Sequence, residues 1–196
     1  MQAGVLEGGF VNGPIDAAYA FRAVMTAMAR PGEIGTVTGA RPPAPMSVAA
    51  GVVALTLFDP ETPVYLAPGH DTQEVRDWIT FHTGAPFCAP ELAMFAVGEW
   101  DALPIAAFGV GTAEYPDRSA TLIIERAALS NTGATLRGPG IEGQAHLFLP
   151  EMEVFQQNKR LFPLGLDFIF TCGDRLAALP RTTRASVSGS SAQEVS

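Results

Sequence analysis

The chain has 196 residues, which is long enough for one domain with a sizeable core. Its hydrophobic fraction of 47% and mean hydropathy of +0.20 argue against an intrinsically disordered protein. Its net charge of −8 argues against nucleic-acid binding, because proteins that bind the phosphate backbone carry a basic face. No apolar stretch is both long and charge-free enough to span a bilayer, and the first residues show no secretory signal, so we expect a cytoplasmic protein without a membrane anchor.

The first half of the chain alternates predicted helices with short extended stretches. Pro14 follows Asn12 and precedes apolar residues at helical spacing, which is typical of a helix start. Asp71 and Glu74 have the spacing of a capping box, and Gly84 is suited to end the helix that follows them. The predicted elements are a helix at 14–30, an extended stretch at 32–37, a buried helix at 46–58, a strand at 63–67 and a helix at 71–83.

The second half reads mainly as short strands separated by Gly, Pro and Asp. The final residues 185–196 lack an apolar pattern, and we expect them to be a disordered tail. Interleaved helices and strands predict a single α/β layered domain over residues 1–184, with no strand order implied. The predicted elements are strands at 93–98, 120–125, 134–138, 146–150 and 166–171, and a helix at 151–162.

Arg22 and Arg30 are the first candidates for binding an anion. They lie eight residues apart on the predicted helix 14–30, about two turns, and should project from a similar face. Arginine presents a rigid fork suited to carboxylate and phosphate. The alternative is that Arg22 is solvated and that Arg30 only complements the helix dipole at the C-terminus.

The stretch LRGPGI, residues 136–141, provides a second candidate. Gly138 and Gly140 permit positive φ and Pro139 fixes its own, so the loop is held without further ordering cost. Such a loop turns backbone N–H groups toward an anion, and Arg137 adds a bidentate fork. The alternative is a tight turn between two strands, with Arg137 on a solvated edge.

Asp167 and Arg181 form a third candidate. Asp167 begins an otherwise apolar strand, which is costly unless the carboxylate is paired or exposed at the strand end. Arg181, followed by two threonines, is suited either to pair with Asp167 or to contact an anion, while Asp167 is equally suited to be an edge residue or a cap. In the stretch 111–121, Ser119 and Thr121 are possible oxyanion donors or ordinary turn residues.

Other chemistry is poorly supported. Two cysteines are too few for a metal site or a disulfide framework, and the three histidines form no ligand pattern, so no metal is expected. Lys159 is the only lysine, and any Schiff-base chemistry rests on it alone. No nucleophile elbow, zinc motif or nucleotide-binding glycine fingerprint is present.

Six stretches in register nevertheless resemble one family. In chain order they are AFRAVMTAMARPG (20–32), DWITFHTGAP (77–86), GTAEYPDRSAT (111–121), LRGPGI (136–141), FPLGLD (162–167) and ALPRTT (178–183). Together they are similar to the PhnH family, the H subunits of the bacterial carbon–phosphorus lyase system. The resemblance covers nearly the whole chain apart from its final residues.

This resemblance implies a role in phosphonate catabolism. It implies an essential subunit, not catalytic alone, that works with companion G, I and J subunits. Their synthase transfers ribose triphosphate from ATP to methylphosphonate and yields α-D-ribose 1-methylphosphonate 5-triphosphate. The fold is expected to resemble that of pyridoxal-phosphate-dependent transferases without the cofactor, and the isolated chain to be a homodimer.

The family offers no catalytic residue to carry over. The hypothesis is therefore limited to residues in the matched stretches, which would contact a phosphorylated small molecule or a carboxylate of a neighbouring subunit. Two alternatives stay open: a stand-alone transferase that uses Lys159, and a small-molecule binding module. The candidate residues are Arg22, Arg30, Arg137 and Arg181 as anion contacts, Asp167 as their orienting partner, and Gly138 and Gly140 as loop-shaping residues.

Overall fold

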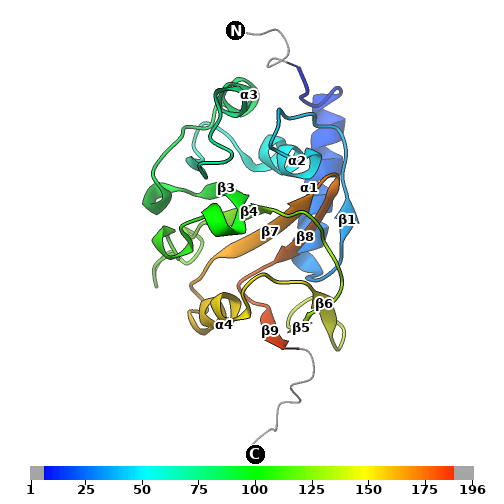
Figure 1. Cartoon of the computed structure of the whole chain (residues 1–196), viewed down its shortest axis with the longest axis vertical. Helices are drawn as coiled ribbons and strands as arrows, with labels where there is room; N and C mark the ends of the chain where they lie inside the picture. The colour runs from blue at the N-terminus through cyan, green and yellow to red at the C-terminus, as the bar shows by residue number, and fades with distance from the viewer. Residues whose placement is uncertain (1–6, 188–196) are drawn as a thin grey trace, which may run out of the picture.

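A six-stranded mixed sheet is the central layer of the computed structural model, which describes residues 7–187 (Figure 1). Its strands are β1 (Gly35–Thr36), β2 (Val64–Leu66), β3 (Phe95–Glu99), β4 (Thr121–Glu125), β7 (Asp167–Cys172) and β8 (Arg175–Leu179). They lie in the order β1-β8-β7-β4-β3-β2. The strands β2, β3, β4 and β7 run parallel, so their carboxyl ends meet at one edge, while β8 and β1 are antiparallel additions.

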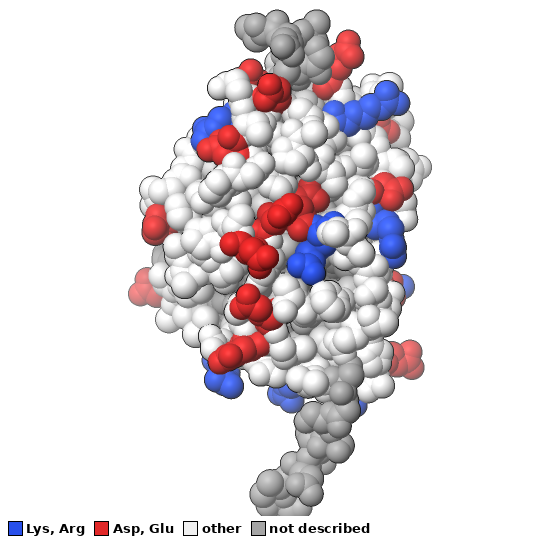
Figure 2. Space-filling model, viewed as in Figure 1, with Lys and Arg blue, Asp and Glu red and all other residues white. Residues whose placement is uncertain are grey.

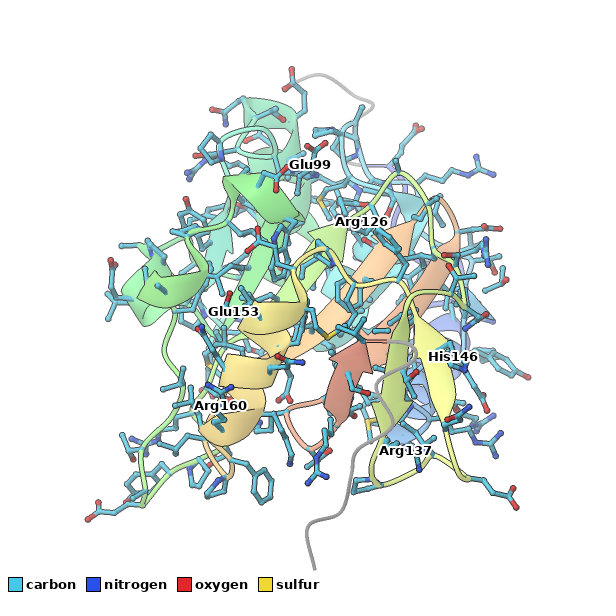
Figure 3. The ribbon with its side chains drawn as sticks, turned by 60° about the horizontal axis from the view of Figure 1, so that its bottom comes forward. Glu99, Arg126, Arg137, His146, Glu153 and Arg160 are labelled. Carbon is cyan, nitrogen blue, oxygen red and sulfur yellow. The ribbon has the colours of Figure 1, made fainter. Side chains whose placement is uncertain are left out.

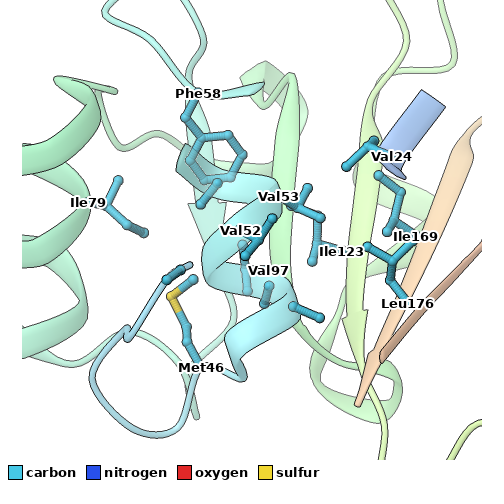
Figure 4. Packing of buried hydrophobic residues seen from close by; sticks show 14 of the residues in the cluster. Val24, Met46, Val52, Val53, Phe58, Ile79, Val97, Ile123, Ile169 and Leu176 are labelled. Atoms are coloured by element: carbon cyan, nitrogen blue, oxygen red, sulfur yellow. The ribbon is translucent and has the colours of Figure 1, made fainter. Parts of the chain in front are cut away.

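Three helices cover one face of this sheet: α1 (Gly13–Ala29), α2 (Val48–Leu57) and α3 (Gln73–Thr83). Val52 and Val53 of α2 belong to one buried cluster with Val97, Ile123 and Ile169 of the sheet (Figure 4). The helix α2 is apolar on nearly every side because it lies between the sheet and the two other helices.

The opposite face carries α4 (Met152–Arg160) and a small antiparallel sheet of β5 (Ala134–Arg137), β6 (Ala145–Leu147) and β9 (Arg184–Val187), in the order β6-β5-β9. Phe155 of α4 stacks on Trp100 and meets Phe168 edge-on, with ring centroids 5.1 Å and 4.9 Å apart. Short 3₁₀ helices, η2 (Pro90–Leu92), η3 (Trp100–Ala102) and η4 (Ile105–Ala107), complete this side.

The sequence of β4 shows why the sheet is central. Ile123 contributes to the cluster under α2, whereas Leu122 and Ile124 contribute to the cluster under α4. A strand covered on both faces reads as a continuous apolar run, as TLIIE does, and this is characteristic of buried parallel sheets.

Most predicted elements are confirmed, with small corrections at their ends. The first helix spans 13–29, so Arg30 is its C-cap and lies outside the last helical turn. The predicted capping box of the third helix is wrong by one residue, because Thr72 is the N-cap and its hydroxyl accepts a hydrogen bond from the Val75 N–H. Gly84 ends that helix in the left-handed conformation, as predicted.

Two strands were missing from the sequence prediction. β8 follows β7 through the tight turn at Gly173 and pairs with it, and β9 pairs with β5 through residue 187. The boundary predicted at residue 184 is therefore too early, because residues 185–187 lie in a paired strand. Residues 188–196 of the predicted tail lie outside the described part. No helix within residues 7–187 is long and apolar enough to cross a membrane.

Candidate functional site

A large pocket lies at the carboxyl edge of the parallel strands. It has a volume of about 720 Å³, and its ionisable lining residues are His70, Glu99, Asp101, Glu125 and Arg126. In open α/β sheets, ligands characteristically bind in the crevice outside the carboxyl ends of the strands. Acidic side chains gather across the middle of the face seen in Figure 2, and Figure 3 shows Glu99 and Arg126 at neighbouring strand ends. We call this pocket of about 720 Å³ the acidic pocket.

Glu125, the last residue of β4, is anchored at the floor of the acidic pocket. Its Oε1 accepts a hydrogen bond of 2.6 Å from the Ser47 N–H, and its Oε2 accepts one of 3.0 Å from the Thr171 hydroxyl. Burial raises the pKa of the Glu125 carboxyl above the ordinary 4.5, and the charge of Glu99 acts in the same direction, while the hydrogen bonds oppose it.

His70 also lines the acidic pocket. It is 3% exposed, and neither ring nitrogen has a hydrogen-bond partner among the described residues. Burial lowers the pKa of His70 below the ordinary 6.5, against the opposing charge of Glu99. The folded protein therefore favours the neutral imidazole.

The buried imidazole makes stability depend on pH. Because the unfolded chain binds a proton at His70 near pH 6.5 while the folded chain does so only at lower pH, acidification through this range favours unfolding. We expect the free energy of unfolding of the wild type to fall relative to that of His70→Gln between about pH 7.5 and 5.5, by at most ~1.4 kcal/mol per pH unit. Urea unfolding of both chains measures this, and parallel pH profiles would contradict it.

The acidic pocket is suited to ligands that donate hydrogen bonds. Its lining has three carboxyl groups, from Glu99, Asp101 and Glu125, and a single arginine. The negative potential of the acidic pocket therefore repels phosphate groups and favours amines or hydroxyls. Within residues 7–187, no cluster of three or more His, Cys, Asp and Glu is suited to hold a metal ion. Sequence reasoning missed this site, although FAVGE and TLIIE each end in a glutamate; recognising it required knowing that the two strands are parallel neighbours.

Arg181 and Asp167 pair with each other, as one of the sequence alternatives held. Both Asp167 oxygens accept from the guanidinium, Oδ1 also accepts from the Arg181 N–H at 2.8 Å, and Arg181 Nη1 donates to the Pro116 carbonyl at 2.6 Å. The Arg181 and Asp167 side chains are 15% and 13% exposed. All three guanidinium nitrogens thus bind protein atoms, and Arg181 joins the 111–121 loop, the start of β7 and the β8–β9 loop.

The LRGPGI loop packs against the end of α1. Gly138 has φ +146° and Gly140 has φ +80°, and the turn is closed by a 3.2 Å hydrogen bond from Ile141 N–H to Gly138 O. A Cβ on Gly140 would lie 1.8 Å from the Ala29 carbonyl oxygen. The glycines therefore serve the close approach of this loop to the α1 terminus.

Arg137, at the start of the loop, is exposed, and its Nη2 donates to Gln144 Oε1 at 3.3 Å. It lines a pocket of about 330 Å³ that also includes Gly138, Pro139, Lys159, Thr182 and Arg184. We call this the basic pocket. Figure 3 shows Arg137 well away from Glu99 and Arg126, so the two pockets are separate.

Arg22 and Arg30 do not join the basic pocket. Arg22 lies 5.9 Å from the Tyr19 ring centroid and lines a different pocket of about 350 Å³ with Glu33. Arg30 forms an exposed ion pair with the same Glu33, at 3.7 Å. The predicted anion contacts are thus divided among three places in the fold: the Glu33 region, the basic pocket and the buried Asp167–Arg181 pair.

Comparison with known proteins matches residues 8–186 to the family described as PhnH, bacterial phosphonate metabolism protein. The chain belongs to the PhnH family. It is 40% identical over 195 residues to the alpha-D-ribose 1-methylphosphonate 5-triphosphate synthase subunit PhnH of Rhizobium meliloti (strain 1021), covering 93% of this chain and 96% of that protein. It is 28% identical over 202 residues to the putative C-P lyase subunit protein HtxG of Stutzerimonas stutzeri, covering 93% and 97%.

The PhnH family assignment confirms the resemblance inferred from the six stretches. Three of them, GTAEYPDRSAT, FPLGLD and ALPRTT, meet at the Arg181 guanidinium, and LRGPGI packs on the end of the first stretch at Ala29. In this PhnH-family chain, therefore, several motif residues hold loops together.

Proposed function

We propose that this chain is the H subunit of a carbon–phosphorus lyase complex and supports the synthesis of α-D-ribose 1-methylphosphonate 5-triphosphate from ATP and methylphosphonate. The observation that carries this proposal is 40% identity to a named synthase subunit across nearly the full length of both chains. The chain acts as a subunit and is not catalytic alone.

Its partners in this proposal are companion G, I and J subunits in the cytoplasm, and a second copy of the chain when it is isolated. Support comes from α1, whose outer side exposes large apolar side chains. Ile15, Tyr19, Phe21 and Met25 are each 50–66% exposed. Large apolar side chains that one helix leaves exposed are suited to a protein–protein contact.

The fold, in the same proposal, resembles that of pyridoxal-phosphate-dependent transferases, without the cofactor. Lys159 lies on α4, beside Asn158, whose side chain bonds both the N–H and the carbonyl of Leu166 just before β7. This places the lysine near the amino end of β7, away from the acidic pocket at the carboxyl edge. We therefore favour a subunit role over a stand-alone transferase built on Lys159.

The direct test is native mass spectrometry of the chain co-expressed with the G, I and J subunits. We expect it to be incorporated in stoichiometric amount, and the chain purified alone to be a dimer. Tyr19→Glu, which places a negative charge on an exposed residue of α1, should weaken these assemblies. Leu92→Glu makes the same charge change at an exposed apolar residue of η2 and is the matched surface control, which should assemble as the wild type does. Absence of the wild-type chain from the purified complex under several ionic strengths would refute the proposed function.

A further inference from the structure

The basic pocket gathers cations from three separate elements. Arg137 ends β5, Arg184 begins β9 and Lys159 lies in the last turn of α4, which packs against β9. These are three of only twelve lysines and arginines in a chain of net charge −8, and no acidic residue lines the pocket. The positive field here is therefore local and runs against the overall charge of the molecule.

The strand register places two of these charges face to face. Arg137 and Arg184 are directly opposite each other in the antiparallel β5–β9 pair. Residues so paired project on the same face with Cβ atoms about 5 Å apart, and like charges at such positions are destabilising. Both side chains are exposed, so neither is required by the core.

No carboxylate neutralises this pair within residues 7–187. The ion pairs there join Arg30 to Glu33, Arg76 to Asp71 and Arg181 to Asp167. Arg137 donates only to the neutral Gln144 amide oxygen, and the Lys159 ammonium lies 4.3 Å from the Phe162 ring centroid. An opposed pair of arginines without a counter-charge is well arranged to share a dianion.

We infer that the basic pocket binds the phosphate or phosphonate group of a small molecule, held between the Arg137 and Arg184 guanidinium forks. Lys159 supplies a third charge, and the Thr182 hydroxyl supplies a further donor. Gly138 allows the backbone to approach closely, since a Cβ there would lie 3.3 Å from the Thr182 carbonyl oxygen. This inference does not rest on the proposed function.

The distribution of charge over the protein supports the same assignment. The acidic pocket repels phosphate, and the Arg181 fork is already bound to Asp167 and Pro116. The acidic pocket favours the polyhydroxyl or amino portion of a ligand, and the basic pocket favours its phosphate group. Only the basic pocket therefore suits the anionic end of a ligand that has both.

The test is a titration of the ¹⁵N-labelled full chain with inorganic phosphate and with tripolyphosphate, at constant ionic strength. We expect saturable shifts of the Gly138 and Thr182 amide resonances, with tighter binding of tripolyphosphate. Arg137→Gln and Arg184→Gln should each weaken binding about tenfold or more, since each removes a charge-assisted bidentate contact. Arg175→Gln makes the same charge change at the exposed first residue of β8 and should leave binding unchanged.

Two results would overturn the inference. One is equal weakening by Arg184→Gln and Arg175→Gln, which would mean that phosphate responds only to the overall charge. The other is an absence of saturable shifts combined with loss of Arg137→Gln from the co-expressed complex, which would mean that the pair holds a carboxylate of a partner subunit. A melting temperature that rises with phosphate in the wild type but not in Arg184→Gln would support it independently.

Discussion

Asp167→Asn is expected to destabilise the protein by about 3 kcal/mol, because removing one partner of an ion pair that is mostly shielded from solvent leaves the other charge uncompensated. Arg181 would then keep its contact with the Pro116 carbonyl but lose its counter-charge at 15% side-chain exposure. The asparagine Oδ1 still accepts from the Arg181 N–H, so the variant isolates the charge and not the turn. Urea unfolding at neutral pH, followed by circular dichroism, measures the effect.

The matched control is Asp71→Asn. Asp71 pairs with Arg76 in the same bidentate manner, but the side chains are 33% and 40% exposed. Exposed pairs contribute about 0–1 kcal/mol, and we expect a loss in that range. If the two variants lose the same free energy, the Asp167–Arg181 pair does not hold its three segments together as we describe.

Gly140→Ala is expected to have the second large effect. The residue has φ +80°, which costs an L-residue about 1–2 kcal/mol, and its new Cβ would meet the Ala29 carbonyl oxygen at 1.8 Å. Backbone has to move to relieve that contact, because Ala29 lies in the last turn of α1. We expect a total loss of about 3 kcal/mol or more in the free energy of unfolding.

Gly143→Ala separates the cost of a positive φ from the cost of the contact with Ala29. Gly143 has a similar φ of +74°, but a Cβ there would meet nothing within 4 Å. It should lose only the conformational part, about 1–2 kcal/mol. Equal losses in the two variants would show that the loop moves away from α1 without cost and that the close approach is not required.

Elements with strong local signals could be predicted from the sequence. The first helix has Pro14 in its first turn, and the third ends at Gly84, where only a glycine adopts the left-handed conformation without strain. The strands TLIIE and LDFIFT were found because they are apolar runs of strand length. β8 and β9 were missed because they lie among glycine, proline and threonine residues, and pairing with β7 and β5 makes them strands.

The candidate sites, too, comprise features that local sequence indicates and features that only tertiary contacts create. LRGPGI was singled out correctly as a constrained loop, since its glycines need positive φ. The partners of Arg137 could not be found, because Lys159 and Arg184 are 22 and 47 positions away. The acidic pocket was missed altogether, since His70, Glu99 and Glu125 come together only when β2, β3 and β4 are aligned in parallel.

The sequence by itself determined the α/β class, most helix and strand positions and the PhnH family, because backbone preferences, apolar periodicity and six motifs in register are local properties of the chain. Only the tertiary structure decided which arginines pair with a carboxylate and which have no counter-charge among the described residues. Arg181 and Arg137 look alike along the chain, but one meets Asp167 in a buried contact and the other meets Arg184 across two strands. Charge interactions depend on distance and burial, and both are set by the packing of segments far apart in sequence.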